Sequence, residues 1–308
     1  MNFSPALFIL SWSCAIQSQA LTPAEVHRLW TTPTALVAKG ETVGVEVEGV
    51  LPGQNQWDVY SRMRFEVVNI LEHSTGVARV APHPLANFIE FDFNGRTHVF
   101  TIKLDGTIKP PQGFFGIEIT SPIMHNEQEL EIFTHIVSEL NSRLGYTPEP
   151  SSTGLHVHLG FKDSSEEEKK LTLLAFEALE STLHAHFKPN PGRRGHLASV
   201  VGQTDRWSAA RLDFIGFLTR IHGEFPNIRM SHLREGNYGT IEVRFFNSTM
   251  NRQKIIQAVN LVRFVIAKIR LRDPLLLKLL IDEIPPEELL NEVLSPLKVK
   301  CVRLLGAS

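Results

Sequence analysis

The chain has 308 residues, a formal net charge of −2 and 43% hydrophobic residues. This length is enough for one large domain or two modest ones, and the composition is that of an ordinary globular protein with a substantial core. The nearly balanced charge lacks the basic excess that marks nucleic-acid-binding domains, so we expect no nucleic-acid partner.

The first twenty residues resemble a secretory signal peptide. Residues 6–16 form an uncharged apolar run, and Ser18-Gln19-Ala20 gives a small-x-small cleavage pattern. The run is too short to span a bilayer comfortably, so a stable membrane anchor is not expected. We therefore expect export to the periplasm or the medium if this segment is a signal, and a cytoplasmic protein if it is instead a buried or frayed N-terminal segment.

The part of the chain that follows predicts β-strands. After a connecting segment over residues 21–41, apolar and polar residues alternate in short runs separated by Pro, Asn and Gly. The predicted strands are 42–50, 65–71, 76–80, 88–93, 98–104 and 116–120.

The second half of the chain mixes helices with strands. Apolar residues with a helical period predict helices over 126–144, 164–186, 205–221 and 252–272, and strands are predicted over 155–161 and 240–246. The Leu-rich end of the chain also reads as helical. The predicted class is α+β, an antiparallel sheet with helices packed against it. No linker is evident, so we expect a single domain over 42–272 with a helical extension over 273–308.

Three short alternations carry candidate chemistry: Glu46-Val47-Glu48, His156-Val157-His158 and Glu242-Val243-Arg244. Each lies in a predicted strand, where residues i and i+2 point to the same face. Charged side chains gathered on a sheet are costly to bury for structure alone. The pattern is better explained if metal ions and an anionic substrate occupy that face.

Each alternation also has a plainer explanation. Glu46 and Glu48 would lie about 7 Å apart, so each could face a different ion of a metal pair, but an exposed edge strand could carry the same pattern. The histidines sit between Gly154 and Gly160. Neutral imidazoles suit zinc, manganese or magnesium sites that also hold carboxylates, although hydrogen-bonded structural histidines are possible.

The last alternation joins a carboxylate to a guanidinium. Glu242 could hold a metal ion while Arg244 binds a phosphate or carboxylate, or the two could form a local ion pair. Glu118 is a further carboxylate on a strand otherwise flanked by isoleucines, and Asp105-Gly106-Thr107 precedes it.

In this order, Glu-x-Glu, Glu, His-x-His and Glu-x-Arg, the chain resembles the amidoligases of the carboxylate–amine ligase superfamily, relatives of glutamine synthetase and glutamate–cysteine ligase. The resemblance spans about residues 42 to 270. The matching stretches are GVEVEG (44–49), LDGTIKPPQGFFGIEITSP (104–122), STGLHVHLGF (152–161) and GTIEVRFFNSTMN (239–251).

The resemblance implies an antiparallel sheet curved into a half-barrel, with helices on its outer face and the site on its concave face. It implies ATP, Mg²⁺ or Mn²⁺, a small-molecule or peptide carboxylate, and an amine. The implied metal ligands are Glu46, Glu48, Glu118, His156 and Glu242. The implied nucleotide-side residues are Glu118, His158 and Arg244, and the implied stabilisers of the phosphoryl group are Arg244, Arg193 and Arg194.

The implied reaction forms an amide through an acyl phosphate. The chain contains neither G-x-x-x-x-G-K-[ST] nor G-x-G-x-x-G, which agrees with a nucleotide site built from metal ions and arginines. A metal-dependent amide or ester hydrolase using the His-x-His strand, or a relative that binds ligand without catalysis, is the alternative. The sequence does not name the substrates or the oligomeric state.

Overall fold

The computed structural model describes residues 42–74, 76–77, 79–82, 87–160, 228–229 and 239–270, with the single residues 164, 172, 176, 179 and 183. The predicted signal peptide, the segment 21–41, the helix 205–221, the C-terminal extension and the pair Arg193 and Arg194 lie outside these residues. Of the predicted helix 164–186, the described positions are 164, which lies in a bend, and 172, 176, 179 and 183, which are helical and buried.

Within the described ranges, the strands form one open antiparallel sheet in the order β2-β3-β4-β5-β1-β6-β8-β7. The strands are β1 (Val43–Pro52), β2 (Arg79–Pro82), β3 (Phe88–Phe93), β4 (Arg96–Leu104), β5 (Phe114–Thr120), β6 (Gly154–Gly160), β7 (Ile228–Arg229) and β8 (Thr240–Asn247). This confirms the α+β class and is consistent with the predicted half-barrel.

Strand β1 lies in the interior of the sheet. It pairs with β5 on one side, where Glu48 faces Glu118, and with β6 on the other, where Glu46 faces His156. The Glu-x-Glu alternation therefore does not lie on an exposed edge strand. Strands β5 and β6, which are far from β1 in the sequence, lie beside it and bring Glu118 and His156 next to its glutamates.

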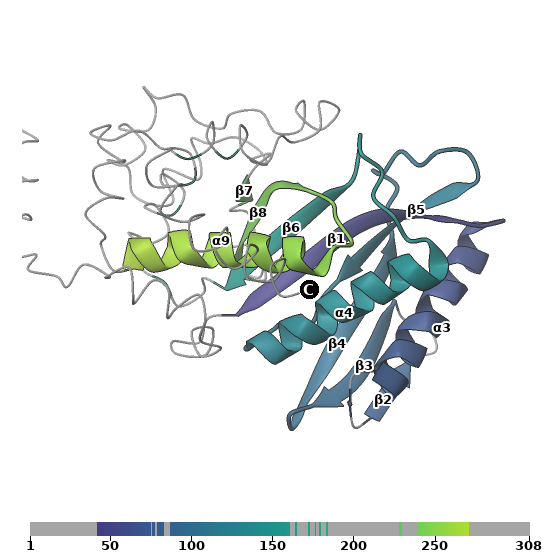
Figure 1. Cartoon of the computed structure of the whole chain (residues 1–308), viewed down its shortest axis with the longest axis horizontal. Coiled ribbons are helices and arrows are strands. Elements are labelled where there is room, and N and C mark those ends of the chain that lie inside the picture. The colour runs from purple at the N-terminus through teal and green to yellow at the C-terminus, as the bar shows by residue number, and fades with distance from the viewer. Residues whose placement is uncertain are drawn as a thin grey trace, which may run out of the picture.

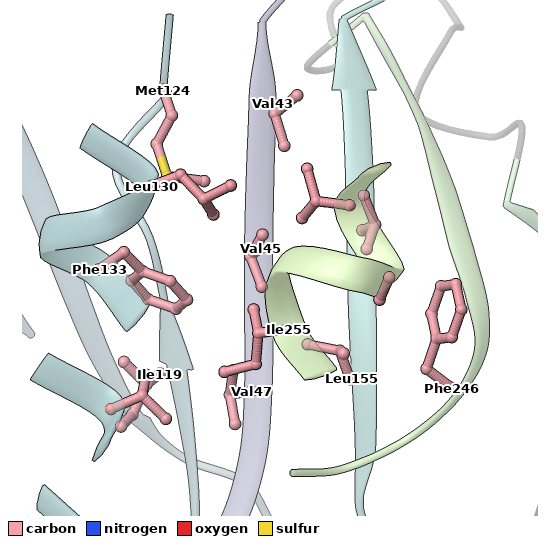
Figure 2. Packing of buried hydrophobic residues seen from close by; sticks show 14 of the residues in the cluster. Val43, Val45, Val47, Ile119, Met124, Leu130, Phe133, Leu155, Phe246 and Ile255 are labelled. Atoms are coloured by element: carbon pink, nitrogen blue, oxygen red, sulfur yellow. The ribbon is translucent and has the colours of Figure 1, made fainter. Parts of the chain in front are cut away.

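The helices α3 (Gln56–Ser74), α4 (Glu127–Leu144) and α9 (Arg252–Arg270) cover one side of the sheet, as Figure 1 shows. None of the described helices is both long enough and apolar enough to cross a membrane. Figure 2 shows the packing between these layers, with Val45 and Val47 of β1 pointing toward Phe133 of α4 and Ile255 of α9. The apolar half of each strand alternation is thus buried under helices, and the polar half faces the other way.

Helix α4 has well-formed ends. The Asn126 side chain accepts a hydrogen bond from the Glu129 backbone N–H at 3.0 Å, and Gly145 closes the helix in the left-handed conformation with φ of 73°. These caps satisfy backbone groups that a helix end leaves without partners. They confirm the boundaries predicted for this helix.

The predicted strand over 65–71 is wrong, because this segment belongs to α3. Its buried residues recur with helical spacing at Val59, Met63, Val67 and Ile70, while Phe65 is 71% exposed. The Asn55 side chain accepts a hydrogen bond from the Asp58 backbone N–H at 2.9 Å and caps the helix start. Taken alone, the apolar run 65–71 fits both the strand period and the helical period. The helical period becomes clear only when the preceding residues of α3 are included.

Gly49, which ends the GVEVEG stretch, is required by a close approach. A Cβ atom placed there would lie 2.5 Å from Cε2 of Tyr146 and 2.7 Å from Cε of Met250. We expect Gly49→Ala to lower the free energy of unfolding by about 1–3 kcal/mol through overpacking. Urea unfolding measures this.

Gly106→Ala is the matched control, since a Cβ there meets no atom within 4 Å and the residue is exposed. We expect it to change stability by about 0.5 kcal/mol or less. Equal effects of the two substitutions would contradict the packing argument.

Candidate metal centre

The polar face of the sheet gathers acidic and imidazole side chains in rows across the strands. In one row, Glu118 lies opposite Lys103 on one side and opposite Glu48 on the other. In the next row, Glu46 lies opposite Thr120 and His156. Farther along, His158 faces Glu242 across β6 and β8. Because each strand has a period of two, all of these side chains share one face.

The first ligand group consists of Glu46, His158 and Glu242. One ligand atom from each residue lies within 4.8 Å of the other two. Nε2 of His158 is 3.4 Å from Oε1 of Glu46. The group draws on β1, β6 and β8, and its carboxylates flank an imidazole in the way expected of a mixed oxygen and nitrogen cation site.

The second ligand group consists of Glu48, Asp105 and Glu118, whose ligand atoms also lie within 4.8 Å of one another. The Gly154 backbone N–H donates to Oε2 of Glu48 at 2.6 Å, and Nζ of Lys103 lies 2.7 Å from Oε1 of Glu118. Oδ1 of Asp105 accepts from the backbone N–H and the hydroxyl of Thr107. These bonds fix the three carboxylates in place.

His156 lies between the two groups. Its Nδ1 is 3.2 Å from Oε2 of Glu46 and 3.2 Å from Oε1 of Glu242, and its Nε2 is 3.5 Å from Oε1 of Glu48. Nε of Arg244 donates to Nε2 of His156 at 3.3 Å and lies 3.2 Å from Oε1 of Glu242. His156 therefore contacts carboxylates of both ligand groups and the guanidinium of Arg244.

Burial and nearby charges shift the pKa values of three side chains on this face, Glu46, His158 and Glu118. Burial acts to raise the pKa of Glu46, but hydrogen bonds from His156 and His158 and their positive charge lower it below its usual value. Burial acts to lower the pKa of His158, but the bond to Glu46 and nearby carboxylate charges raise it. Burial and then the charge of Glu46 raise the pKa of Glu118, against the opposing effect of Lys103.

The donor chemistry of these groups fits divalent cations. Carboxylate oxygens dominate both groups, and one imidazole joins the first, a combination suited to Mg²⁺ or Mn²⁺ more than to zinc. Burial is the main cause of the raised pKa of Glu118, and repulsion from the nearby carboxylate of Glu46 adds to it. A cation bound at each group would offset that repulsion.

The structure brings together most of the predicted site residues, namely Glu46, Glu48, Glu118, His156, His158, Glu242 and Arg244. Asp105 was missed as a ligand, although its Asp-Gly-Thr turn shortly before Glu118 was visible in the sequence. The geometry also places His158, predicted on the nucleotide side, in the first ligand group, while His156 touches carboxylates of both groups. The individual roles of these residues stay predictions.

The local alternation of Glu242 and Arg244 is an ion pair, as the plainer explanation proposed, but it is not isolated. The same Nε atom that lies near Glu242 also donates to His156. The register of β6 with β8 shifts between Leu155 and Val157, so two residues of β8, Arg244 and the one after it, lie opposite His156. The pair is therefore part of the wider polar face.

Fold and site together define an α+β protein with acidic and imidazole side chains gathered on one face of an open antiparallel sheet. The family described as "Putative amidoligase enzyme" matches residues 39–210, more than half of the chain. The chain belongs to this amidoligase family, which confirms the resemblance drawn from the motifs. The matched range includes β1 through β6 and ends before β8. A search of curated proteins finds no match.

We expect Glu48→Gln to separate cation binding from folding. The amide oxygen can still accept from Gly154, and one buried negative charge is removed, so stability without cations should stay equal or rise. Mn²⁺ at 100 times its Kd should stabilise the parent by about 2.7 kcal/mol per site, and this gain should fall in the variant. Thermal unfolding with and without Mn²⁺ measures both effects.

Glu72→Gln, at an exposed position of α3, is the matched control and should respond to Mn²⁺ like the parent. A large loss of cation-free stability in Glu48→Gln would show that the carboxylate is structural, and an unchanged response to Mn²⁺ would show that it holds no cation.

Proposed function

We propose that the protein is an ATP-dependent carboxylate–amine ligase that requires Mg²⁺ or Mn²⁺ and forms an amide bond on a small-molecule or peptide carboxylate. The observation that carries the proposal is the convergence of two carboxylate-rich ligand groups on one sheet face, Glu46, His158 and Glu242 in one and Glu48, Asp105 and Glu118 in the other. Membership of the amidoligase family agrees with it.

The cations would be held by the two ligand groups, with His156 between them. Bound divalent ions would supply charge that offsets the phosphate oxygens of ATP during transfer. The protein's own contribution is to fix the ligands before substrate arrives. Glu46 and Glu48 extend from neighbouring positions of one buried strand, so their separation is set by the backbone and not by flexible side chains.

The proposed reaction has two steps. An oxygen of the substrate carboxylate attacks the γ-phosphorus of ATP, the bond from that phosphorus to the β–γ bridging oxygen breaks, and ADP leaves. The amine nitrogen then attacks the acyl carbon, the carbon–oxygen bond to phosphate breaks, and the nitrogen loses a proton. Inorganic phosphate and an amide are the products.

Arg244 is suited to stabilise charge on the transferred phosphoryl group. Its Nε is held by Glu242 and His156, which fixes the plane of the guanidinium, and its side chain stays 21% exposed beside the first ligand group. A planar guanidinium held in this way can bind two phosphate oxygens at once. Arg193 and Arg194 are proposed for the same role from the sequence and lie outside the described residues.

The decisive experiment supplies ATP, Mg²⁺ and pools of carboxylates and amines, including peptides, and detects condensed products by mass. We expect a product whose formation requires ATP and releases ADP and phosphate. A substrate carboxylate labelled with oxygen-18 should transfer label to the phosphate, as the acyl phosphate requires. Glu242→Gln should abolish turnover.

Other outcomes would favour the alternatives. Amide or ester hydrolysis with Zn²⁺ and no use of ATP would identify a metallohydrolase built on the His-x-His strand. Ligand binding with neither reaction would identify a non-catalytic relative. If residues 1–20 act as an export signal, as we also propose, the ligase must work in a compartment that holds ATP.

A further inference from the structure

Tyr146 packs in the core, and its hydroxyl contacts the backbone of the two strands that carry Glu48 and Glu118 of the second ligand group. Its side chain is completely buried, and its hydroxyl is 2.8 Å from the carbonyl oxygen of Val47 and 2.9 Å from that of Ile117. These carbonyls belong to the peptide groups that lead into Glu48 and Glu118. The two glutamates are direct partners across β1 and β5. One phenol therefore links the backbones of two carboxylates that repel each other.

Tyr146 is itself held firmly. Its backbone N–H donates to the Leu140 carbonyl at the end of α4, and its carbonyl accepts from the Asn141 side chain at 2.8 Å. The next residue, Thr147, exchanges two backbone hydrogen bonds with Val50 of β1, at 2.8 and 3.1 Å. Gly49 leaves the space that the phenol ring occupies. The hydroxyl is thus anchored to α4 and to β1 at once.

Glu48 receives two further contacts from other strands. The Ser248 hydroxyl, just past β8, donates to the Glu48 backbone carbonyl, and the Gly154 backbone N–H donates to the Glu48 carboxylate. Tyr146 bonds to the carbonyl before Glu48 and Ser248 bonds to the carbonyl of Glu48 itself, so the backbone is held on both sides of this residue. The bond from Gly154 holds the Glu48 side chain. Such restraint exceeds what the strand pairing alone would give.

We propose that Tyr146, assisted by Ser248, is a positioning residue that sets the spacing of Glu48 and Glu118 and so preforms the second cation site. The inference rests on the proposed function, because it assumes that this group binds a divalent cation. It adds a role for a buried phenol that touches neither cation nor substrate.

The electrostatic surroundings of the phenol agree with this placement. Burial raises the pKa of Tyr146 well above its usual value, and the charges of Glu48, Glu118 and Asp105 raise it further. These three residues are the members of the second ligand group. The hydroxyl therefore keeps its proton and remains a donor to the two carbonyls.

The test is a titration of the full chain with Mn²⁺, followed by electron paramagnetic resonance and calorimetry. We expect two sites in the parent. In Tyr146→Phe, which keeps the ring, one site should weaken about tenfold or more while the other keeps its affinity. The weakened site should be the one that Glu118→Gln removes. Ser248→Ala should weaken the same site and serves as a second variant if Tyr146→Phe does not fold.

Ile70→Val, a small truncation in the buried part of α3, is the control for lost stability alone and should leave both affinities unchanged. A parent with two sites and variants that match it in both affinities overturns this inference only. Equal weakening of both sites also overturns it, since that outcome reports general loosening. A parent that binds no Mn²⁺ overturns the proposed function and this inference together.

Discussion

Repulsion between buried carboxylates is the constraint on which the arrangement of this protein depends. Glu48 and Glu118 are direct neighbours across two strands, where like charges destabilise a sheet. The protein offsets this cost with cationic and donor groups at the edges of the cluster: Lys103 beside Glu118, the Gly154 N–H on Glu48, and Arg244 with His156 beside Glu242. The pKa of Glu118 nevertheless remains raised, first because the carboxyl group is largely buried and then because of the charge of Glu46. This concentration of negative charge is the basis of our proposal that the face binds divalent cations.

The opposite face of the same strands makes that arrangement possible. Val45, Val47 and Ile119 pack under α4 and α9 in a close-packed core, and a shift of one residue in any strand would exchange the apolar and polar faces. The core therefore fixes the register, and the register fixes which carboxylate faces which imidazole. Tyr146 connects the two faces at one point, since its ring is in the core and its hydroxyl reaches the peptides that carry Glu48 and Glu118. Precision on the polar side is thus a consequence of packing on the apolar side.

The sequence predicted those features that depend on local periodicity. Alternation placed Glu46 and Glu48, His156 and His158, and Glu242 and Arg244 on common strand faces, and helical spacing with Asn126 and Gly145 defined α4. The prediction from sequence failed where contacts between distant segments decide the structure. The run 65–71 reads equally as strand or helix until Val59 and Met63 extend its period. Asp105 joins Glu48 and Glu118 only because the turn after β4 folds back toward β5, which no local pattern reveals. The order of the motifs in the sequence indicated the family, and the strand pairing in the structure gave the distances between their side chains.

The two ligand groups differ in their surroundings, and this asymmetry bears on which reaction the face supports. The first group adjoins Arg244, whose fixed guanidinium suits phosphate oxygens, whereas the second adjoins the ammonium group of Lys103. A hydrolase that activates water needs one polarising ion and room for one substrate. A ligase must hold a phosphoryl donor and a carboxylate at opposite ends of a short path and keep their charges apart until they react. His156, within 3.5 Å of carboxylates from both groups, lies between them, as the two-substrate reaction that we propose would require.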